Sequence, residues 1–176
     1  MKTLKERCDK QRKNINPDIK KHYTPEDIVK RCIREIPYNK EDIVLDVGNG
    51  LNMVWYNNLK HCKKDWVEID KGKDFFKYNK KVDWCIGNPP YRELWKVIEH
   101  TTYISKKGFA FLVAIDGINR LTPKRLVFLG ERGFYLNKIY VMNIKLWWGR
   151  YFLLIFTKNN EGFFNILDDL KESEKE

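Results

Sequence analysis

The sequence predicts an α/β fold in which helices cover a mostly parallel sheet. Three segments, at 43–50, 65–70 and 82–87, carry this prediction, because each has the pattern of a strand and ends in, or is followed by, residues that interrupt one. The first segment leads into a turn with two glycines, the second ends in acids, and two prolines come shortly after the third. Segments with helical spacing stand on either side of these runs, as expected when strands and helices alternate.

A helix is expected ahead of the first strand. Thr24 is a natural N-cap, Pro25 suits the first helical position, and acids follow in the first turn. Apolar residues then recur at helical spacing from Ile28 to Ile33, which gives this helix a buried face.

The back half of the chain is expected to hold two helices and three strands. In order, they are a helix at 92–105 that ends at Lys106-Lys107-Gly108, a strand at 109–115, a helix that begins at Pro123 and ends at Gly130 or Gly133, and strands at 138–144 and 151–157.

Composition limits the class of protein. The 176 residues have room for one domain, and no stretch is apolar enough to span a membrane or to act as a signal segment. The four cysteines form no C-x-x-C pair and the three histidines are scattered. The sequence therefore predicts a cytoplasmic protein with reduced thiols, no metal site and no membrane role.

Charge is distributed unevenly along the chain, whose net charge is +10. Residues 1–21 carry eight Lys or Arg against three acids, whereas residues 166–176 are net acidic. We therefore expect a basic N-terminal arm (1–21), a catalytic domain (22–165) and an acidic C-terminal tail (166–176). The arm suits a polyanion, which favours nucleic acid as the partner, although such arms are often only solvated.

The tetrapeptide Asn88-Pro89-Pro90-Tyr91 is the most specific feature of the sequence. Two prolines have fixed φ angles and no N–H, so they end the third strand and hold the backbone in one shape. The Asn88 side chain and the Pro89 carbonyl then offer two acceptors beside the Tyr91 ring. This combination suits a planar ring with an exocyclic NH2 group, and the alternative is a plain Pro-Pro turn.

Asn-Pro-Pro-Tyr resembles the catalytic motif of S-adenosylmethionine-dependent amino-methyltransferases. These enzymes modify adenine N6 or cytosine N4 in nucleic acids, or glutamine N5 in release factors. The resemblance implies S-adenosylmethionine as cofactor and a Rossmann-like class I methyltransferase fold, in which the last two strands form an antiparallel hairpin. The order of motifs (Tyr-Thr-Pro, glycine loop, Asn-Pro-Pro-Tyr) is similar to that of gamma-type adenine enzymes.

The resemblance therefore implies methylation of adenine N6 in DNA, with the base flipped out of the duplex. An RNA adenine methyltransferase is the alternative. A glutamine-N5 protein methyltransferase and a non-catalytic binding subunit are less favoured.

The same resemblance assigns residues to the parts of the cofactor. They are Tyr23, Thr24 and Pro25 at the methionine end, Asp46, Gly48 and Gly50 in the glycine loop, Glu68 at the ribose, and Asp74 and Phe75 at the adenine. Asp70 competes with Glu68 for the ribose. Asn52 stands where the family usually has another glycine.

The connection between the second and third strands is short. Gly87 lies only nineteen positions after Glu68, where a complete Rossmann methyltransferase has a helix, a strand and another helix. The fold is therefore expected to be contracted around the third strand of that family, which resembles short phage-like and prokaryotic adenine methyltransferases.

Substrate contacts are predicted outside these motifs. Trp147-Trp148-Gly149-Arg150 lies between the last two strands, where paired tryptophans suit core packing or, alternatively, a wall of the target pocket. In the second interpretation Trp148 and Arg150 contact the substrate, and Lys124 is a further candidate. Because the chain has no large target-recognition domain, a specificity-conferring protein partner is also an open expectation.

Overall fold

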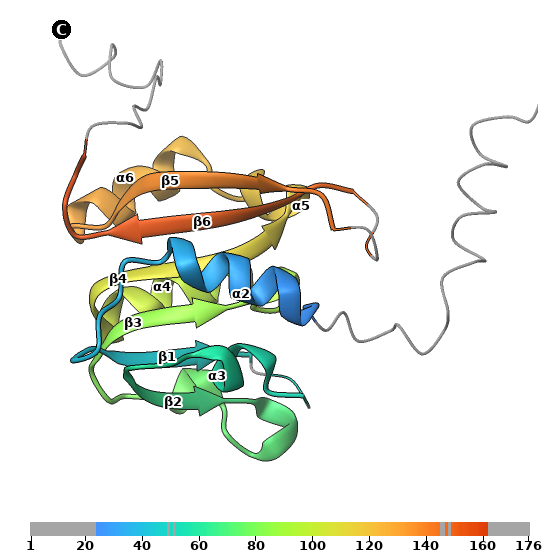
Figure 1. Cartoon of the computed structure of the whole chain (residues 1–176). Helices are drawn as coiled ribbons and strands as arrows, with labels where there is room; N and C mark the ends of the chain where they lie inside the picture. The colour runs from blue at the N-terminus through green and yellow to red at the C-terminus, as the bar shows by residue number, and fades with distance from the viewer. Residues whose placement is uncertain (1–23, 49, 51, 145–146, 148, 162–176) are drawn as a thin grey trace, which may run out of the picture.

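The computed structural model describes residues 24–161, apart from 49, 51, 145, 146 and 148. Six strands in these residues form one sheet (Figure 1), and their order across it is β2 (Lys63–Val67), β1 (Ile43–Val47), β3 (Val82–Gly87), β4 (Ser105–Ala114), β6 (Tyr151–Thr157) and β5 (Tyr135–Met142). The first four are parallel, and β6 runs antiparallel to both β4 and β5. The predicted Rossmann-like sheet with an antiparallel C-terminal hairpin is confirmed.

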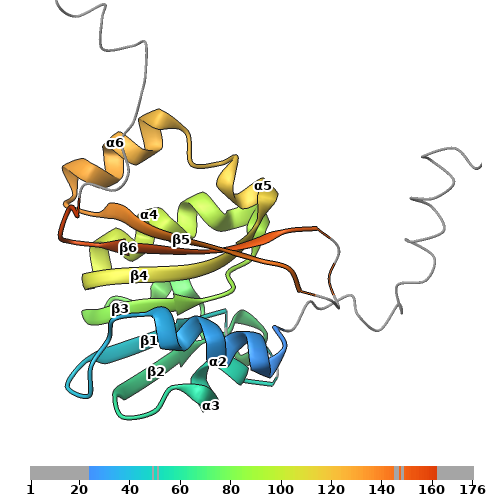
Figure 2. The same cartoon turned by 45° about the horizontal axis from the view of Figure 1, so that its top comes forward.

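Helices cover both faces of the sheet (Figure 2). They are α2 (Glu26–Glu35) and α3 (Val54–Asn58) on one face, α4 (Leu94–Ile104) and α6 (Pro123–Glu131) on the other, and the short α5 (Ile115–Ile118) after β4. Alternate residues of β4 point to opposite faces of the sheet. Phe109 and Phe111 pack with residues of α4 and α6, whereas Ala110 and Leu112 pack with residues of α2. Burial on both faces explains why the central strands read as continuous apolar runs.

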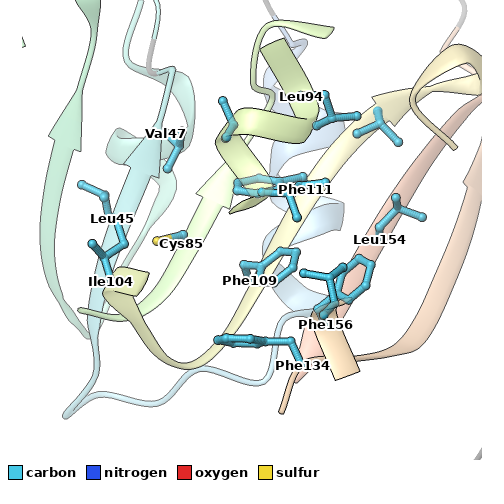
Figure 3. Close-up of a cluster of buried hydrophobic side chains, with 14 of the residues drawn as sticks. Leu45, Val47, Cys85, Leu94, Ile104, Phe109, Phe111, Phe134, Leu154 and Phe156 are labelled. Atoms are coloured by element: carbon cyan, nitrogen blue, oxygen red, sulfur yellow. The ribbon is translucent and has the colours of Figure 1, made fainter. Parts of the chain in front are cut away.

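The core on the α4 and α6 side is rich in phenylalanine (Figure 3). Phe109 of β4 stacks on Phe156 of β6 with 4.5 Å between ring centroids, and Phe134 lies 5.4 Å from Phe109. All three rings are fully buried. Their packing joins the antiparallel hairpin to the parallel part of the sheet. The strands that carry the predicted motifs are therefore held by a close-packed core.

The connection from β2 to β3 is contracted, as predicted. Residues 68–81, all of which the structure describes, hold only two 3-10 turns, Ile69–Lys71 and Phe75–Lys77, and no strand. Gly72 has a φ of 73° between these turns. The loop therefore leaves β2 at the edge of the sheet and returns directly to β3.

The prediction that Lys106-Lys107-Gly108 ends the preceding helix is wrong. Helix α4 ends at Ile104, and all three residues belong to β4, which begins at Ser105. Gly108 pairs with Trp84 of β3 and with Thr157 of β6. A Cβ at Gly108 would lie 2.6 Å from the Trp84 ring, so glycine lets this ring pack against the strand. These long-range pairings outweigh the local tendency of a Lys-Lys-Gly segment to end a helix.

Other element boundaries also differ from the predicted ones. Strand β2 occupies Lys63–Val67 instead of 65–70, because these residues pair with Ile43–Val47 of β1, and Glu68 therefore follows the strand. Strand β5 occupies Tyr135–Met142 instead of 138–144, because its first residues pair with the end of β6 and a register shift lies between Leu136 and Lys138. A 3-10 turn, Tyr91–Glu93, separates the Asn-Pro-Pro segment from α4. No helix in the described part of the chain is both long and apolar enough to cross a membrane.

Candidate active site

A cleft of about 360 Å³ lies at the carboxyl ends of β1, β2 and β3. Its lining includes the predicted site residues Gly48, Glu68, Asp74, Phe75, Asn88 and Pro90. The chain passes from β1 outward to β2 and then returns to β3 on the other side of β1, so the loops after β1 and β3 diverge. Doubly wound sheets bind ligands at such a switch point, outside the carboxyl ends of the strands.

Two glycines allow the loops after β1 and β3 to approach each other. Gly48 has a φ of 76°, and a Cβ on it would lie 3.6 Å from the carbonyl oxygen of Asn88. Gly87 has a φ of 141°, and its Cβ would lie 2.5 Å from the carbonyl oxygen of Val47. No larger residue fits at position 87 without moving β1. The sequence analysis missed this requirement because only the fold brings Val47 beside Gly87.

Asp46 is a buried acid under the glycine loop. Its Oδ2 atom accepts a 2.9 Å hydrogen bond from the N–H of Tyr56 in α3, and its Oδ1 atom is buried with no hydrogen-bond partner in the described structure. Burial raises the pKa of Asp46 to about 8, the charge of Glu68 adds to the rise, and the Tyr56 bond opposes it. Asp46 is fully buried and does not line the cleft.

Glu68 joins the end of β2 to the glycine loop. Its carboxylate accepts hydrogen bonds from the N–H of Gly50 and, at 3.3 Å, from the N–H of Asp70. The side chain lines the cleft, whereas Asp70 does not. A carboxylate has about four acceptor positions, so Glu68 can still accept hydrogen bonds from a ligand's hydroxyl groups.

The loop of residues 69–76 supplies apolar surface to the cleft. Asp74 begins a 3-10 turn by accepting from the N–H of Phe76 at 3.0 Å. Phe75 lines the cleft but is only 8% exposed, and its ring meets the edge of His100 at 4.9 Å. Ile69 and Phe76 line the same cleft with 71% and 46% exposure. Such exposed apolar side chains suit a flat apolar ligand surface, and the sequence analysis overlooked both of them.

The Asn-Pro-Pro-Tyr segment lies beside this cleft. Asn88 donates from Nδ2 to the Thr24 hydroxyl at 3.3 Å, whereas its Oδ1 atom is buried without a hydrogen-bond partner in the described structure. Pro89 is buried and Pro90 is exposed. The Tyr91 hydroxyl is also buried; burial raises its pKa, and its interaction with the Asn88 side chain opposes the rise. The segment thus holds an unused acceptor, Asn88 Oδ1, close to the glycine loop.

Thr24 does not act as the expected helix N-cap. Helix α2 begins at Glu26, Pro25 occupies the cap position, and no side chain caps the helix. The Thr24 hydroxyl instead accepts from Trp55 Nε1 at 3.4 Å and from Asn88 Nδ2. The described structure therefore connects the Thr-Pro segment to the Asn-Pro-Pro segment. Tyr23 lies outside the described residues.

The two predicted substrate residues that the structure describes, Arg150 and Lys124, lie outside the cleft. Both are exposed, and Trp148 lies outside the described residues. Trp147 is buried against Tyr151 with 4.7 Å between ring centroids, which agrees with the core-packing interpretation for this tryptophan. The described residues contain no group of three or more His, Cys, Asp or Glu able to hold a metal ion.

The fold defines the class of protein to which this chain is similar: the Rossmann-like, class I methyltransferases. A protein proposed to be an RNA methyltransferase, from Pyrococcus horikoshii, matches with a TM-score of 0.60 and 20% identity, over 92% of this chain and 100% of that one. A dimethyladenosine transferase from Plasmodium falciparum matches with a TM-score of 0.59 and 16% identity, over 85% and 66% of the two chains.

A third solved structure contains the cofactor of the class. Magnesium protoporphyrin IX methyltransferase from Synechocystis, with bound S-adenosylmethionine, matches with a TM-score of 0.54 and 12% identity, over 76% of this chain and 77% of that one. At these identities the likeness concerns the fold. No family model matches this chain, and neither does any curated protein.

Proposed function

We propose that this protein transfers a methyl group from S-adenosylmethionine to the exocyclic N6 amino group of adenine in a nucleic acid. The observation that carries the proposal is the buried Oδ1 atom of Asn88, which has no hydrogen-bond partner in the described structure and stands at the switch point of a methyltransferase fold. A buried acceptor without a partner costs free energy, and a bound amino group would remove that cost.

The chain's own residues fit the cofactor. A cleft of about 360 Å³ lies within the usual range of ligand sites, roughly 300–1,000 Å³. Gly48 and Gly50 permit a close backbone approach, Glu68 suits the ribose hydroxyls, and Ile69 and Phe76 suit the faces of a purine. S-adenosylmethionine supplies a methyl group on a positively charged sulfur when it is bound.

Asn88 and Pro89 would prepare the amino group of the target base. The Oδ1 atom of Asn88 and the carbonyl of Pro89 each accept one amino hydrogen, which directs the nitrogen lone pair toward the methyl carbon. The new N–C bond forms as the C–S bond breaks, positive charge moves from sulfur to nitrogen, and the amine then releases a proton to solvent. Catalysis of this kind depends on alignment and on fixed acceptors instead of a strong base.

Tyr91 completes the proposed base pocket. Its ring would stack on the extruded adenine, an interaction worth about 1–3 kcal/mol. A base in a duplex has to leave the stack to reach this point, whereas a single-stranded base does not.

DNA is the favoured substrate because the order of motifs resembles that of gamma-type adenine enzymes, although the motifs themselves do not separate DNA from RNA. RNA is a second candidate supported by a separate observation. Two of the solved structures with this fold are a proposed RNA methyltransferase and a dimethyladenosine transferase. The first of these matches over 92% of this chain and 100% of that chain.

An Asn88→Ala variant tests the proposed role of the amide. We expect methyl transfer to DNA or RNA to fall by roughly 100- to 1,000-fold, as when a transition-state acceptor or donor is removed, while calorimetric titration shows unchanged S-adenosylmethionine affinity. Asn119→Ala, at an exposed asparagine after α5, is the matched control and should keep full activity. Full turnover by Asn88→Ala with cofactor bound would contradict the assignment.

A further inference from the structure

We propose that Thr24 is a positioning residue for the Asn88 amide, an inference that rests on the proposed function. Thr24 precedes α2, and its hydroxyl is contacted from two other parts of the fold. Trp55 of α3 donates to it from Nε1 at 3.4 Å, and Asn88 after β3 donates to it from Nδ2 at 3.3 Å. Thr24 and Trp55 are only 5% and 2% exposed, so little water competes for these bonds.

The hydrogen-bond capacity of the hydroxyl explains what it can do. A threonine hydroxyl has two acceptor positions and one donor hydrogen. The indole of Trp55 can only donate, so it uses one acceptor position and fixes where the oxygen lies. The second acceptor position receives the Asn88 amide hydrogen. Both acceptor positions of Thr24 are therefore used by the two neighbouring elements.

In the observed arrangement Thr24 holds one end of the Asn88 amide and leaves the other end for the base. The NH2 end of the amide is bound to Thr24, and the Oδ1 end remains buried and unpartnered. If the amide rotated so that Oδ1 and Nδ2 exchanged places, its NH2 group would point at the amino group of the target. Two hydrogen-bond donors would then oppose each other, and no hydrogen bond could form. Thr24 thus keeps the acceptor of Asn88 available for the amino group, although it does not touch the reacting atoms itself.

The two variants Thr24→Val and Thr24→Ser separate the hydroxyl from the shape of the side chain. Valine keeps the branched shape and lacks the hydroxyl, whereas serine keeps the hydroxyl and lacks the methyl group. A positioning role predicts that Thr24→Val lowers kcat by roughly 10- to 100-fold, with the KM for nucleic acid changed by less than about threefold. Thr24→Ser should retain most of kcat. Thr102→Val, at a threonine whose hydroxyl donates to Glu99 within α4, is the matched control.

A second measurement reads the amide directly, without catalysis. In protein labelled with 15N-asparagine, the Asn88 side-chain amide should show slow solvent exchange in wild type and in Thr24→Ser. In Thr24→Val the exchange should be at least about tenfold faster, because its acceptor is gone. If wild type methylates no adenine but this exchange pattern holds, the proposed function fails while the Thr24–Asn88 bond stands.

Either of two results would overturn the inference. One is a Thr24→Val variant with wild-type kcat and wild-type amide exchange. The other is a loss of kcat in Thr24→Ser that equals the loss in Thr24→Val, because the effect would then follow packing of the methyl group instead of the hydroxyl.

Discussion

Phe75 and Phe76 are neighbours in the chain with opposite surroundings. Phe75 is in the core against His100, and Phe76 is half-exposed at the cleft. The motif resemblance assigned the adenine contact to Phe75. Phe76 and Ile69 are exposed at the cleft. We therefore propose that they, and not Phe75, provide the apolar surface for that contact, while Phe75 packs beneath the loop.

This difference predicts opposite effects of two alanine substitutions. Phe76→Ala should weaken S-adenosylmethionine binding by roughly tenfold and change the free energy of unfolding by less than about 0.5 kcal/mol. Phe75→Ala should lower the free energy of unfolding by about 3–5 kcal/mol, because a buried ring is lost. Calorimetric titration and urea unfolding measure the two quantities. Weaker binding without loss of stability in Phe75→Ala would reverse the assignment.

The titration of Asp46 makes the stability of the fold depend on pH. Its pKa is about 8 in the folded protein against an ordinary value of 3.8, mainly because of burial. Between these two values the folded state holds a proton that the unfolded state has lost. Asp46 therefore makes folding less favourable as pH rises from about 4 to about 8, and its contribution is constant above that.

Asp46→Asn removes this titration and keeps an oxygen able to accept from the N–H of Tyr56. Relative to wild type, the variant should gain in Tm as pH rises from 5 to 8, and the difference should level off above pH 8. Calorimetric Tm values from pH 5 to 9 give the comparison. A constant difference between the two proteins over that range would show that Asp46 does not titrate there.

Individual site residues could be predicted from the sequence when their role depends on local pattern. Gly48, Glu68 and Asn88 follow strand ends, and an apolar run that stops at a glycine, an acid or a proline is visible in the chain itself. Ile69 and Phe76 could not be recognised, because their exposure is a property of the folded loop. Thr24 has a capping pattern, but long-range bonds to Trp55 and Asn88 use its hydroxyl.

At the scale of elements, the close approach of β1 and β3 at their carboxyl ends shapes the site. Gly87 ends β3 with a φ of 141°, and a Cβ there would lie 2.5 Å from the carbonyl oxygen of Val47. Gly87→Ala therefore adds both backbone strain and a clash with β1. We expect it to lower the free energy of unfolding by about 3 kcal/mol or more.

Gly72→Ala is the matched control for this substitution. Gly72 also has a positive φ, 73°, but nothing lies within 4 Å of its Cβ position. It should lose only about 1 kcal/mol, the cost of the backbone conformation. Urea unfolding of the two variants measures the difference. Equal losses in the free energy of unfolding would mean that the close approach of β1 does not constrain position 87.

Elements could be predicted where their burial is continuous. Strands β3 and β6 have the expected boundaries, because both consist mainly of apolar residues and are followed by clear breaks. Strand β4 begins earlier than expected, because Lys106 and Lys107 are polar and only the pairing partners on either side make them part of a strand. Such pairing is not visible in a local window of sequence.

For the whole molecule, the short β2–β3 connection is the distinguishing feature. The contraction could be predicted from the length of the segment between Glu68 and Gly87, because nineteen positions cannot hold a helix, a strand and a second helix. Its consequence could not be predicted. Among the described residues β2 is the edge strand, and the loop of residues 69–76 forms the wall of the cleft beside it. The basic arm, the acidic tail and a protein partner stay predictions.

The most direct measurement of the central claim is mass spectrometry of nucleosides after incubation with methyl-deuterated S-adenosylmethionine. Unmethylated DNA and RNA are treated separately with wild-type protein and with Asn88→Ala. We expect label in N6-methylated deoxyadenosine or adenosine with wild type only, and the labelled pool identifies the substrate. Label in cytosine or in protein glutamine, or no label in any pool while the cofactor binds, would contradict the proposed adenine chemistry.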